Sequence, residues 1–374
     1  MLSGAGDDTY ELRSSPNCGR PVPRCAVNWK EIAVRKSSAR STLGAVVSMV
    51  VAASWSLVGV PAAHATTTCD GLPATVVGSA SGETLSGTSG DDVIVGLGGD
   101  DTIVGLAGND RVCAGDGDDT VYGEFVVVPD VLPGLPAPGP LENLSDRLFG
   151  EAGDDLLIGN SGTGVISVSA AYVADNDHID GGSGSDVISG GFLDVTITAV
   201  SGGIVGLNDT LIGGDDPDTI YGYGRTITVG TGAGLAGAVL IGNLNDTISG
   251  GGGGDTIYGD ARTATLGVSA PVTAETSNDT ITGGEGNDTI YGDYETLNSL
   301  SGAKAITSGH RDTIDAGPGD DVLYGDAKNG NANFISLVVG NIDNVNGGIG
   351  TDTADAGPSL DTCTNVENQA NCEL

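Results

Sequence analysis

A nine-residue pattern of polar and hydrophobic positions recurs along most of this chain. Four copies follow one another without a gap: "GTSGDDVIV" (87–95), "GLGGDDTIV" (96–104), "GLAGNDRVC" (105–113) and "AGDGDDTVY" (114–122). Each copy has glycine in its first half, an aspartate at the sixth position and an aliphatic residue at the eighth. The second half favours a short β-strand whose eighth residue, such as Ile94 or Ile103, points inward. The glycine half predicts a tight turn, because glycine accepts positive φ there.

Beyond residue 122 the nine-residue repeat comes in pairs. The second member of each pair keeps its glycines, as in "GGGGGDTIY" at 250 and "GGEGNDTIY" at 283, whereas the first keeps mainly its last half, as in "NDTIS" and "NDTIT". Insertions of 13 to 19 residues separate the pairs and give a larger period of 31 to 37. We expect two nine-residue repeats to make one coil of the fold. Insertions such as "GRTITVGTGAGLAGAVLIGN" contain two β-prone runs around a glycine turn, which predicts a hairpin. We therefore predict an all-β protein, a right-handed parallel β-roll or β-solenoid with hairpin-like insertions along one edge.

Composition and charge fit a thin, elongated core. The 374 residues include 64 glycines but only 15 aromatic residues, which is too few for one thick globular core. Residues 1–65 hold seven basic and four acidic residues, so the rest has seven basic against 46 acidic residues, a net charge of −39. Such a charge argues against nucleic-acid and anionic-membrane partners, and favours cations or basic partners.

The N-terminal region has the pattern of a secretory signal. The basic stretch "KEIAVRKSSAR" precedes the 19-residue apolar run "TLGAVVSMVVAASWSLVGV", and Ala63 and Ala65 supply small residues for cleavage after Ala65. A membrane anchor is the alternative, and the long stretch before Arg35 suggests an over-extended start. We predict these segments: a leader at 1–65, a lead-in at 66–86, uninterrupted repeats at 87–122, paired repeats with insertions at 123–364, and a cysteine-bearing tail at 365–374.

Four cysteines follow the leader. An even number in an exported chain predicts disulfides, and four cysteines allow three pairings. We expect the local pairs, Cys69 with Cys113 and Cys363 with Cys372, with free thiols as the alternative. The export signal and the cysteines together predict a secreted, extracellular protein without membrane contact once the leader is removed.

The regular aspartates raise an electrostatic problem. Stacked coils lie about 4.8 Å apart, and two carboxylates at roughly 5 Å repel by about 3 kcal/mol at an effective dielectric constant near 20. Calcium reverses the sign of this term, since it takes six to eight oxygen ligands at about 2.4 Å and the turns offer both carboxylates and carbonyls. The sequence therefore predicts multiple calcium ions between successive turns.

At this level of detail the chain resembles the RTX nonapeptide family of haemolysin-type calcium-binding repeats, with the pattern G-G-x-G-x-D-x-U-x over about residues 78 to 364. Its export signal makes it similar to exported repeat proteins of Gram-positive bacteria, actinobacteria in particular. The resemblance implies a parallel β-roll in which calcium bridges turns on the same side of successive coils. It implies as metal ligands the carboxylates of Asp92, Asp101, Asp110, Asp119, Asp155, Asp186, Asp218, Asp255, Asp288, Asp321 and Asp352, and the carbonyls of Gly181, Gly213, Gly250 and Gly283.

Some copies depart from the family pattern. The turns that precede Asp209, Asp246, Asp279 and Asp312 read "IVGL", "IGNL", "TAET" and "TSGH" in place of the family's glycine pattern, so we expect these aspartates to lack a carbonyl cradle and to bind calcium poorly. Aspartates that merely cap turns are the alternative for the whole set.

The remaining features favour binding over catalysis. Tyr221, Tyr258, Tyr291 and Tyr324 recur at the ninth position, and we expect them to stack under the insertions; a sugar-binding surface is the alternative. The mature chain has neither G-x-S-x-G nor H-E-x-x-H and only two histidines, so we predict no enzyme. We predict a secreted calcium-binding protein that folds when it binds calcium outside the cell. The alternatives are a calcium-dependent adhesin or matrix protein that binds surfaces or glycans through its insertions, and a cryptic glycan-active β-helix enzyme.

Overall fold

The structure is a computed structural model of the chain. It describes residues 67–124, 145–168, 172–173, 176–200, 204–205, 208–229, 239–242, 245–266, 271–275, 278–299, 304–308, 311–326, 329–332, 337–339, 343–356 and 361–373. The predicted leader at 1–65 lies outside these residues. The regular elements of the described part are all strands, and none of its segments is a helix that could cross a membrane.

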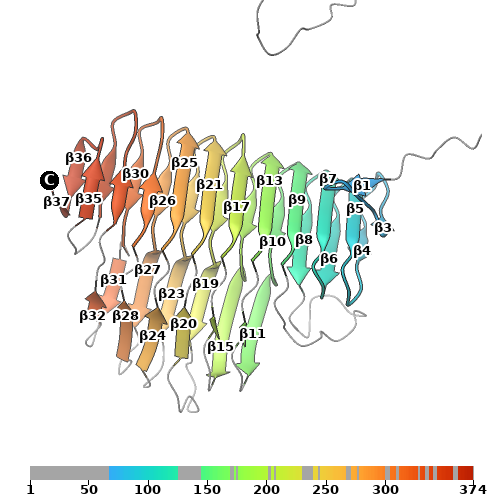
Figure 1. Cartoon of the computed structure of the whole chain (residues 1–374), viewed down its shortest axis with the longest axis horizontal. Helices are drawn as coiled ribbons and strands as arrows, with labels where there is room; N and C mark the ends of the chain where they lie inside the picture. Colours follow the sequence, from blue (N-terminus) through green and yellow to red (C-terminus); the bar gives the residue numbers. More distant parts are fainter. Residues whose placement is uncertain are drawn as a thin grey trace, which may run out of the picture. The chain divides into compact units, whose positions relative to one another are not determined.

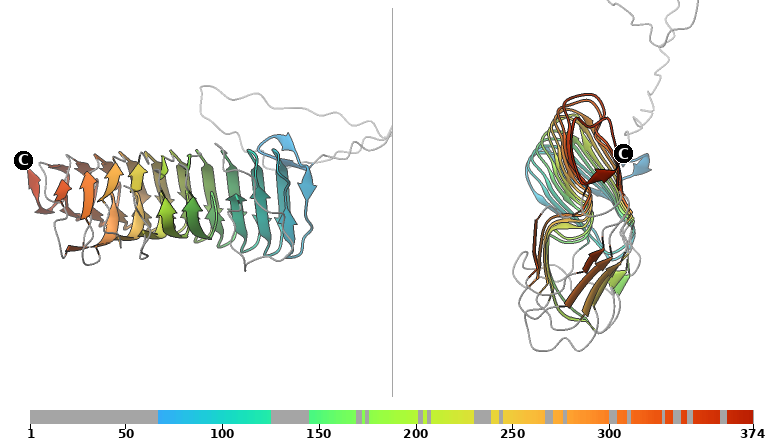
Figure 2. Two further views of the ribbon diagram at one scale, coloured as in Figure 1. Left: turned by 90° about the horizontal axis from the view of Figure 1, so that it is seen from below. Right: turned by 90° about the vertical axis from the view of Figure 1, so that its left-hand side faces the viewer.

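Two parallel sheets face each other and form a β-roll (Figures 1 and 2). Roll sheet 1 contains β3 (Val76–Val77), β5 (Val93–Gly98), β7 (Arg111–Asp116), β9 (Arg147–Ala152), β13 (His178–Ser183), β17 (Thr210–Gly214), β21 (Thr247–Gly252), β25 (Thr280–Glu285), β29 (Thr313–Asp315), β33 (Asn344–Asn346), β35 (Asp361–Thr364) and β37 (Cys372–Glu373). Roll sheet 2 contains β4 (Thr84–Ser86), β6 (Thr102–Leu106), β8 (Thr120–Glu124), β10 (Leu156–Ile158), β14 (Val187–Ser189), β18 (Thr219–Tyr221), β22 (Thr256–Tyr258), β26 (Thr289–Tyr291), β30 (Val322–Tyr324), β34 (Thr353–Asp355) and β36 (Asn368–Ala370). The chain alternates between the two sheets, so two nine-residue repeats make one coil, and the predicted β-roll is confirmed.

The core is a narrow double row of aliphatic side chains between the two roll sheets. The eighth-position residues that the repeat predicts to point inward are all fully buried: Ile94, Ile103, Ile188, Ile220, Ile257 and Ile290. The parallel register aligns equivalent residues, as in the pairing of Ile220 with Ile257 and of Ile257 with Ile290. The residues on either side of each aliphatic position point to the opposite face of the sheet, because side chains alternate along a strand.

The insertions form two further parallel sheets. Insertion sheet 1 contains β11 (Thr163–Val168), β15 (Asp194–Val200), β19 (Gly224–Val229), β23 (Ala261–Leu266), β27 (Tyr294–Ser299) and β31 (Asn329–Ala332). Insertion sheet 2 contains β12 (Tyr172–Val173), β16 (Ile204–Val205), β20 (Val239–Gly242), β24 (Pro271–Glu275), β28 (Lys304–Ser308) and β32 (Leu337–Val339). Viewed along the stacking axis in Figure 2, these strands lie beside the roll as a second lobe.

The predicted hairpin pairing inside each insertion is wrong. The two β-prone runs of the insertion after Tyr221 do become strands, β19 and β20, but β19 pairs in parallel with β15 and β23, and β20 with β16 and β24. The roll already places successive insertions one strand spacing apart, about 4.8 Å. Each insertion strand therefore finds its hydrogen-bonding partner in the next coil and needs no tight turn to fold back on itself.

A stack of tyrosines lies on the outer face of roll sheet 2. Tyr221, Tyr258, Tyr291 and Tyr324 follow one another with ring centroids 5.1, 4.9 and 4.9 Å apart and nearly parallel planes. Tyr221, Tyr258 and Tyr291 are only 5 to 6% exposed and pack with Val187 and Leu193. Because Leu193 directly precedes β15, the stack joins the roll to the insertion lobe. Burial favours the packing role for these rings over sugar binding.

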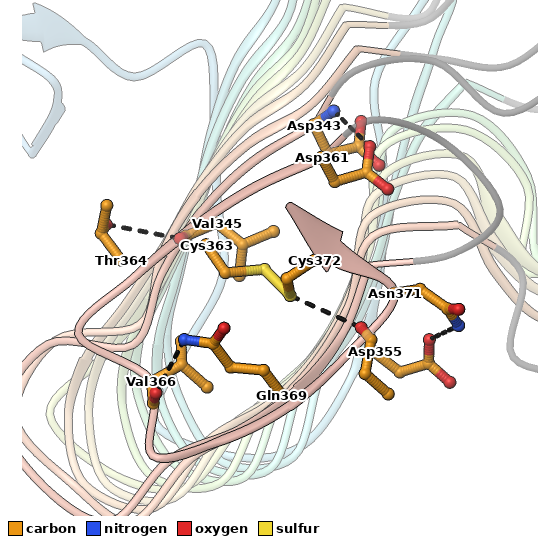
Figure 3. The surroundings of a disulfide bond; sticks show 11 residues. Asp343, Val345, Asp355, Asp361, Cys363, Thr364, Val366, Gln369, Asn371 and Cys372 are labelled. Atoms are coloured by element: carbon orange, nitrogen blue, oxygen red, sulfur yellow. Dashed lines mark hydrogen bonds between the residues drawn. A yellow bond between two sulfur atoms is a disulfide. The ribbon is translucent and has the colours of Figure 1, made fainter. Parts of the chain in front are cut away.

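Both expected disulfides form. Cys69–Cys113 attaches the antiparallel β1 (Thr68–Cys69) and β2 (Leu72–Pro73) to β7. Cys363–Cys372 closes the last coil, where the Gln369 side-chain amide donates to the Val366 carbonyl and the Asn371 amide donates to Asp355 (Figure 3).

Candidate functional site

The turns that enter roll sheet 2 carry a continuous ladder of aspartates, which we call column 2. Each aspartate directly precedes a strand, and its backbone N–H donates to Oδ1 of the equivalent residue in the next coil, at 2.7 to 3.0 Å. Its members are Asp101, Asp119, Asp155, Asp186, Asp218, Asp255, Asp288, Asp321 and Asp352. Glutamates occupy both ends: Glu83 N–H donates to Asp101, and Glu367 accepts from Asp352 N–H.

An equivalent ladder, column 1, lies where the strands of roll sheet 1 begin. Its N–H to Oδ1 hydrogen bonds measure 2.7 to 2.9 Å. Its members are Asp92, Asp110, Asp146, Asp177, Asp209, Asp246, Asp279, Asp312, Asp343 and Asp361. Column 1 therefore continues without a break through the coils that carry insertions.

Four members of column 1 were missed as candidate ligands by the sequence reasoning: Asp146, Asp177, Asp343 and Asp361. Their glycine turns are absent from the adjacent sequence. The signal that could have found them is an aspartate two positions before an inward residue, as in "DRL", "DHI", "DNV" and "DTC". The inward residues that follow the first three, Leu148, Ile179 and Val345, are fully buried.

Many of these carboxylates have one oxygen without a hydrogen bond. Within the described part of the chain no donor reaches the Oδ2 atoms of Asp101, Asp110, Asp119, Asp155, Asp186, Asp218, Asp246, Asp255, Asp279, Asp288, Asp321, Asp343 and Asp352. These side chains are only 0 to 3% exposed. Buried polar atoms in proteins are nearly always satisfied, and a buried carboxylate without compensation is costly. The repeated open oxygen therefore fits a bound cation.

Glycine leaves room for that cation beside each open oxygen in column 2. A Cβ placed on Gly150, Gly181, Gly213 or Gly250 would collide with Oδ2 of the aspartate in its own turn and with the carbonyl oxygen of the next coil's glycine. Those carbonyls belong to Gly181, Gly213, Gly250 and Gly283. The structure thus places the four predicted carbonyls next to column 2 aspartates.

Column 1 has the same glycine cradle, which the sequence reasoning expected to be absent. A Cβ on Gly222 would lie 2.7 Å from Oδ2 of Asp246, and one on Gly259 would lie 2.7 Å from Oδ2 of Asp279. The carbonyls of Gly259 and Gly292 complete the two cradles. The expectation was wrong because each insertion leaves the roll after the glycine and returns before the aspartate, so residues far apart in sequence form one turn.

The donor set consists entirely of oxygens, which suits a hard divalent cation such as calcium. No group of three or more acidic, histidine or cysteine side chains converges among the described residues. A cation here would therefore take its ligands from carboxylates and backbone carbonyls of successive coils. Binding it would offset the charge of the aspartates that the fold brings together.

Burial perturbs these acids strongly. Burial and the charges of neighbouring aspartates together raise the pKa of Asp110, Asp155, Asp186 and Asp218 to about 7 each, although the ladder hydrogen bond from a backbone N–H acts in the opposite direction. For Asp343, burial followed by the charges of Asp326 and Asp293 raises the pKa to about 8. Without a cation, the folded roll holds protons on these carboxyls that the unfolded chain would release.

The raised pKa values predict that the folded, metal-free protein is more stable at acidic pH than at neutral pH. Between about pH 4, the unfolded aspartate pKa, and the raised values of 7 to 8, the folded state binds more protons than the unfolded one. The free energy of unfolding then falls as pH rises through this window. We expect calcium-depleted protein in metal-free buffer to gain β structure by circular dichroism when the pH is lowered from 8 to 5. A constant spectrum over that range would contradict a dominant role of these carboxyls.

A parallel β-roll with two ladders of buried carboxylates and glycine cradles defines a class of cation-binding repeat proteins. The family model described as RTX calcium-binding nonapeptide repeat (4 copies) matches residues 77–112, 96–125, 143–166, 174–196, 205–224, 241–261, 272–293 and 306–329. The chain belongs to this family, and its repeats bind multiple calcium ions. A search of curated proteins found no match to the chain.

Proposed function

We propose that this chain is a secreted protein whose β-roll forms when calcium binds to both aspartate columns outside the cell. The observation that carries the proposal is the buried, open Oδ2 oxygen repeated from coil to coil in column 2 and at Asp110, Asp246, Asp279 and Asp343 of column 1. Where calcium is scarce, self-repulsion and the thin aliphatic core keep the chain unfolded. Extracellular calcium modules bind at about 0.1 to 1 mM, so export itself would trigger folding.

Calcium in column 1 would also order the insertion lobe. The glycine that begins each cradle and the aspartate that ends it lie at the two ends of one insertion, as with Gly222 and Asp246. A cation bound between them closes the base of the insertion, while the tyrosine stack supports its first strand. Insertion sequences differ from coil to coil. This variation supports a role of the insertion lobe in recognising an extracellular surface or glycan, and hence a binding function for the protein.

Export and calcium loading are tested together on the full gene product. We expect the protein in the culture medium to begin at Thr66, and equilibrium dialysis at millimolar calcium to find more than three bound ions per chain. A cell-associated protein with its leader intact would contradict secretion. Fewer than two or three bound ions would contradict the calcium-loaded columns, whatever the location of the protein.

A further inference from the structure

The outer face of roll sheet 1 carries different side chains on β7, β9 and β13 than on β17, β21 and β25. In β17, β21 and β25, the outward positions hold mainly hydroxyl side chains: Thr210, Thr247 and Thr280 in one row, and Ile212, Ser249 and Thr282 in the other. The same rows in β7, β9 and β13 hold Arg111, Arg147 and His178, and Cys113, Phe149 and Asp180. The outward positions of β7, β9 and β13 therefore bring basic, acidic and aromatic side chains together, whereas those of β17, β21 and β25 do not.

A cavity of about 220 Å³ lies at this place. It is lined by Asp70, Cys113, Phe149, Glu151, Asp180 and Gly182. The Cys69–Cys113 disulfide holds β1 against the roll, so that Asp70, which follows β1, reaches one side of the cavity. The cavity is small for a drug-sized ligand, and its volume suits a short organic group.

One wall of the cavity is apolar and firmly packed. Phe149 packs against the cluster formed by Cys69, Val93, Val95 and Cys113. The Arg147 guanidinium lies 5.6 Å from the Phe149 ring centroid, and the His178 ring meets Phe149 edge-on at 5.9 Å. These contacts fix the ring, so the wall is formed before any ligand arrives.

Two acidic side chains, Glu151 and Asp180, also line the cavity, and Asp180 lies next to Phe149 on the neighbouring strand. Arg111 and Arg147 both direct their Nε atoms to Asp70, at 3.4 and 2.9 Å. Among the described residues, no ion pair joins Glu151 or Asp180 to a basic side chain. Burial raises the pKa of Asp180, although His178 lowers it, and burial followed by the Asp116 charge raises the pKa of Glu151.

We propose that this cavity binds an alkylammonium group, with its carbon chain along Phe149 and the disulfide and its charge between Glu151 and Asp180. An aliphatic chain gains from burial on the apolar wall, and an ammonium group gains charge-assisted hydrogen bonds to carboxylates. The strongly negative chain also attracts cations from solution. The group could belong to a small amine or to a lysine side chain of a partner protein.

Glu151 stands at a position where glycine is the less strained residue. Its φ is 73°, and its neighbours in the same row are Gly115 and Gly182, which also have positive φ. A side chain in this region costs backbone energy that glycine avoids. Leu97 and Leu106 share the conformation, so strain alone does not mark a site. It does provide a variant, Glu151→Gly, that removes the carboxylate without harming the fold.

The test measures binding of pentylamine to the calcium-loaded chain by saturation-transfer NMR, with pentanol as the neutral comparison. We expect pentanol to bind about tenfold more weakly than pentylamine, and Asp180→Asn and Glu151→Gly each to weaken pentylamine about tenfold. Glu151→Gly should also raise the unfolding midpoint. Asp315→Asn is the matched control, because Asp315 occupies the same outward row in β29, away from the cavity. It should leave pentylamine binding unchanged.

Three results would overturn the proposal: no transfer to pentylamine, equal binding of pentanol, or equal weakening by Asp315→Asn. Loss of pentylamine when calcium is raised beyond saturation of the columns would also overturn it, since the carboxylates would then hold a metal. Nα-acetyl-lysine amide distinguishes the two sources of the amine. Binding as tight as that of pentylamine supports a lysine of a partner protein, and much weaker binding supports a small amine.

Discussion

Removing calcium at neutral pH is expected to abolish most of the β structure of this protein. Neighbouring carboxylates in each column repel by about 3 kcal/mol per pair at an effective dielectric constant near 20, and both columns repeat this contact along the roll. The total stability of a folded domain is only about 5 to 15 kcal/mol. Protonating the aspartates does not rescue the fold at pH 8, because that pH lies above the raised pKa of about 7 that burial gives Asp155 and Asp186.

Circular dichroism during calcium titration of chelator-treated protein measures this effect. We expect a cooperative gain of β structure with calcium and little gain with magnesium, which is smaller and demands a near-octahedral site. Full β structure in excess chelator at pH 8 would show that the aliphatic core and the two disulfides suffice without the metal. The coupled folding mechanism would then be wrong.

Substituting one aspartate in either column is expected to raise the calcium concentration needed for folding by about tenfold, equivalent to about 1.4 kcal/mol. Asp279→Asn in column 1 and Asp288→Asn in column 2 make a matched pair, since they precede β25 and β26 in neighbouring turns. Each aspartate is 1% exposed and has an open Oδ2. Asparagine keeps the Oδ1 acceptor for the ladder hydrogen bond but removes the charge that attracts the cation.

Glu285→Gln is the control for this comparison. Glu285 is the exposed last residue of β25 and lies between the two aspartates in the sequence, so its substitution changes the net charge equally without touching either column. We expect its calcium midpoint to stay close to that of the unchanged protein. If Asp279→Asn behaves like Glu285→Gln while Asp288→Asn does not, column 1 does not hold calcium, and the glycine-poor turns are as weak as their local sequence suggests.

In the insertions, the formation of strands was predictable from the local sequence, but the pairing of those strands was not. Strand propensity in "RTITV" and "AVLIG" correctly predicted two strands, because propensity is a property of a few adjacent residues. The choice of partner depended on the spacing of the whole stack, which no single insertion encodes. For the same reason the cavity beside Phe149 had no sequence signal: its lining residues come from β7, β9, β13 and the turn after β1, and a disulfide brings that turn to the three strands.

The amino-acid sequence by itself determined the period, the inward aliphatic rows and the register of the column 2 aspartates, since each follows from the repeat and from side-chain alternation along a strand. Tertiary structure alone decided that column 1 is complete. Gly222 and Asp246 become parts of one cradle only when the coils stack and close the insertion between them. The ligands of column 1 come from the two ends of an insertion, so they meet only if those ends are held close together. In this protein the β-roll holds the two ends of each insertion in place.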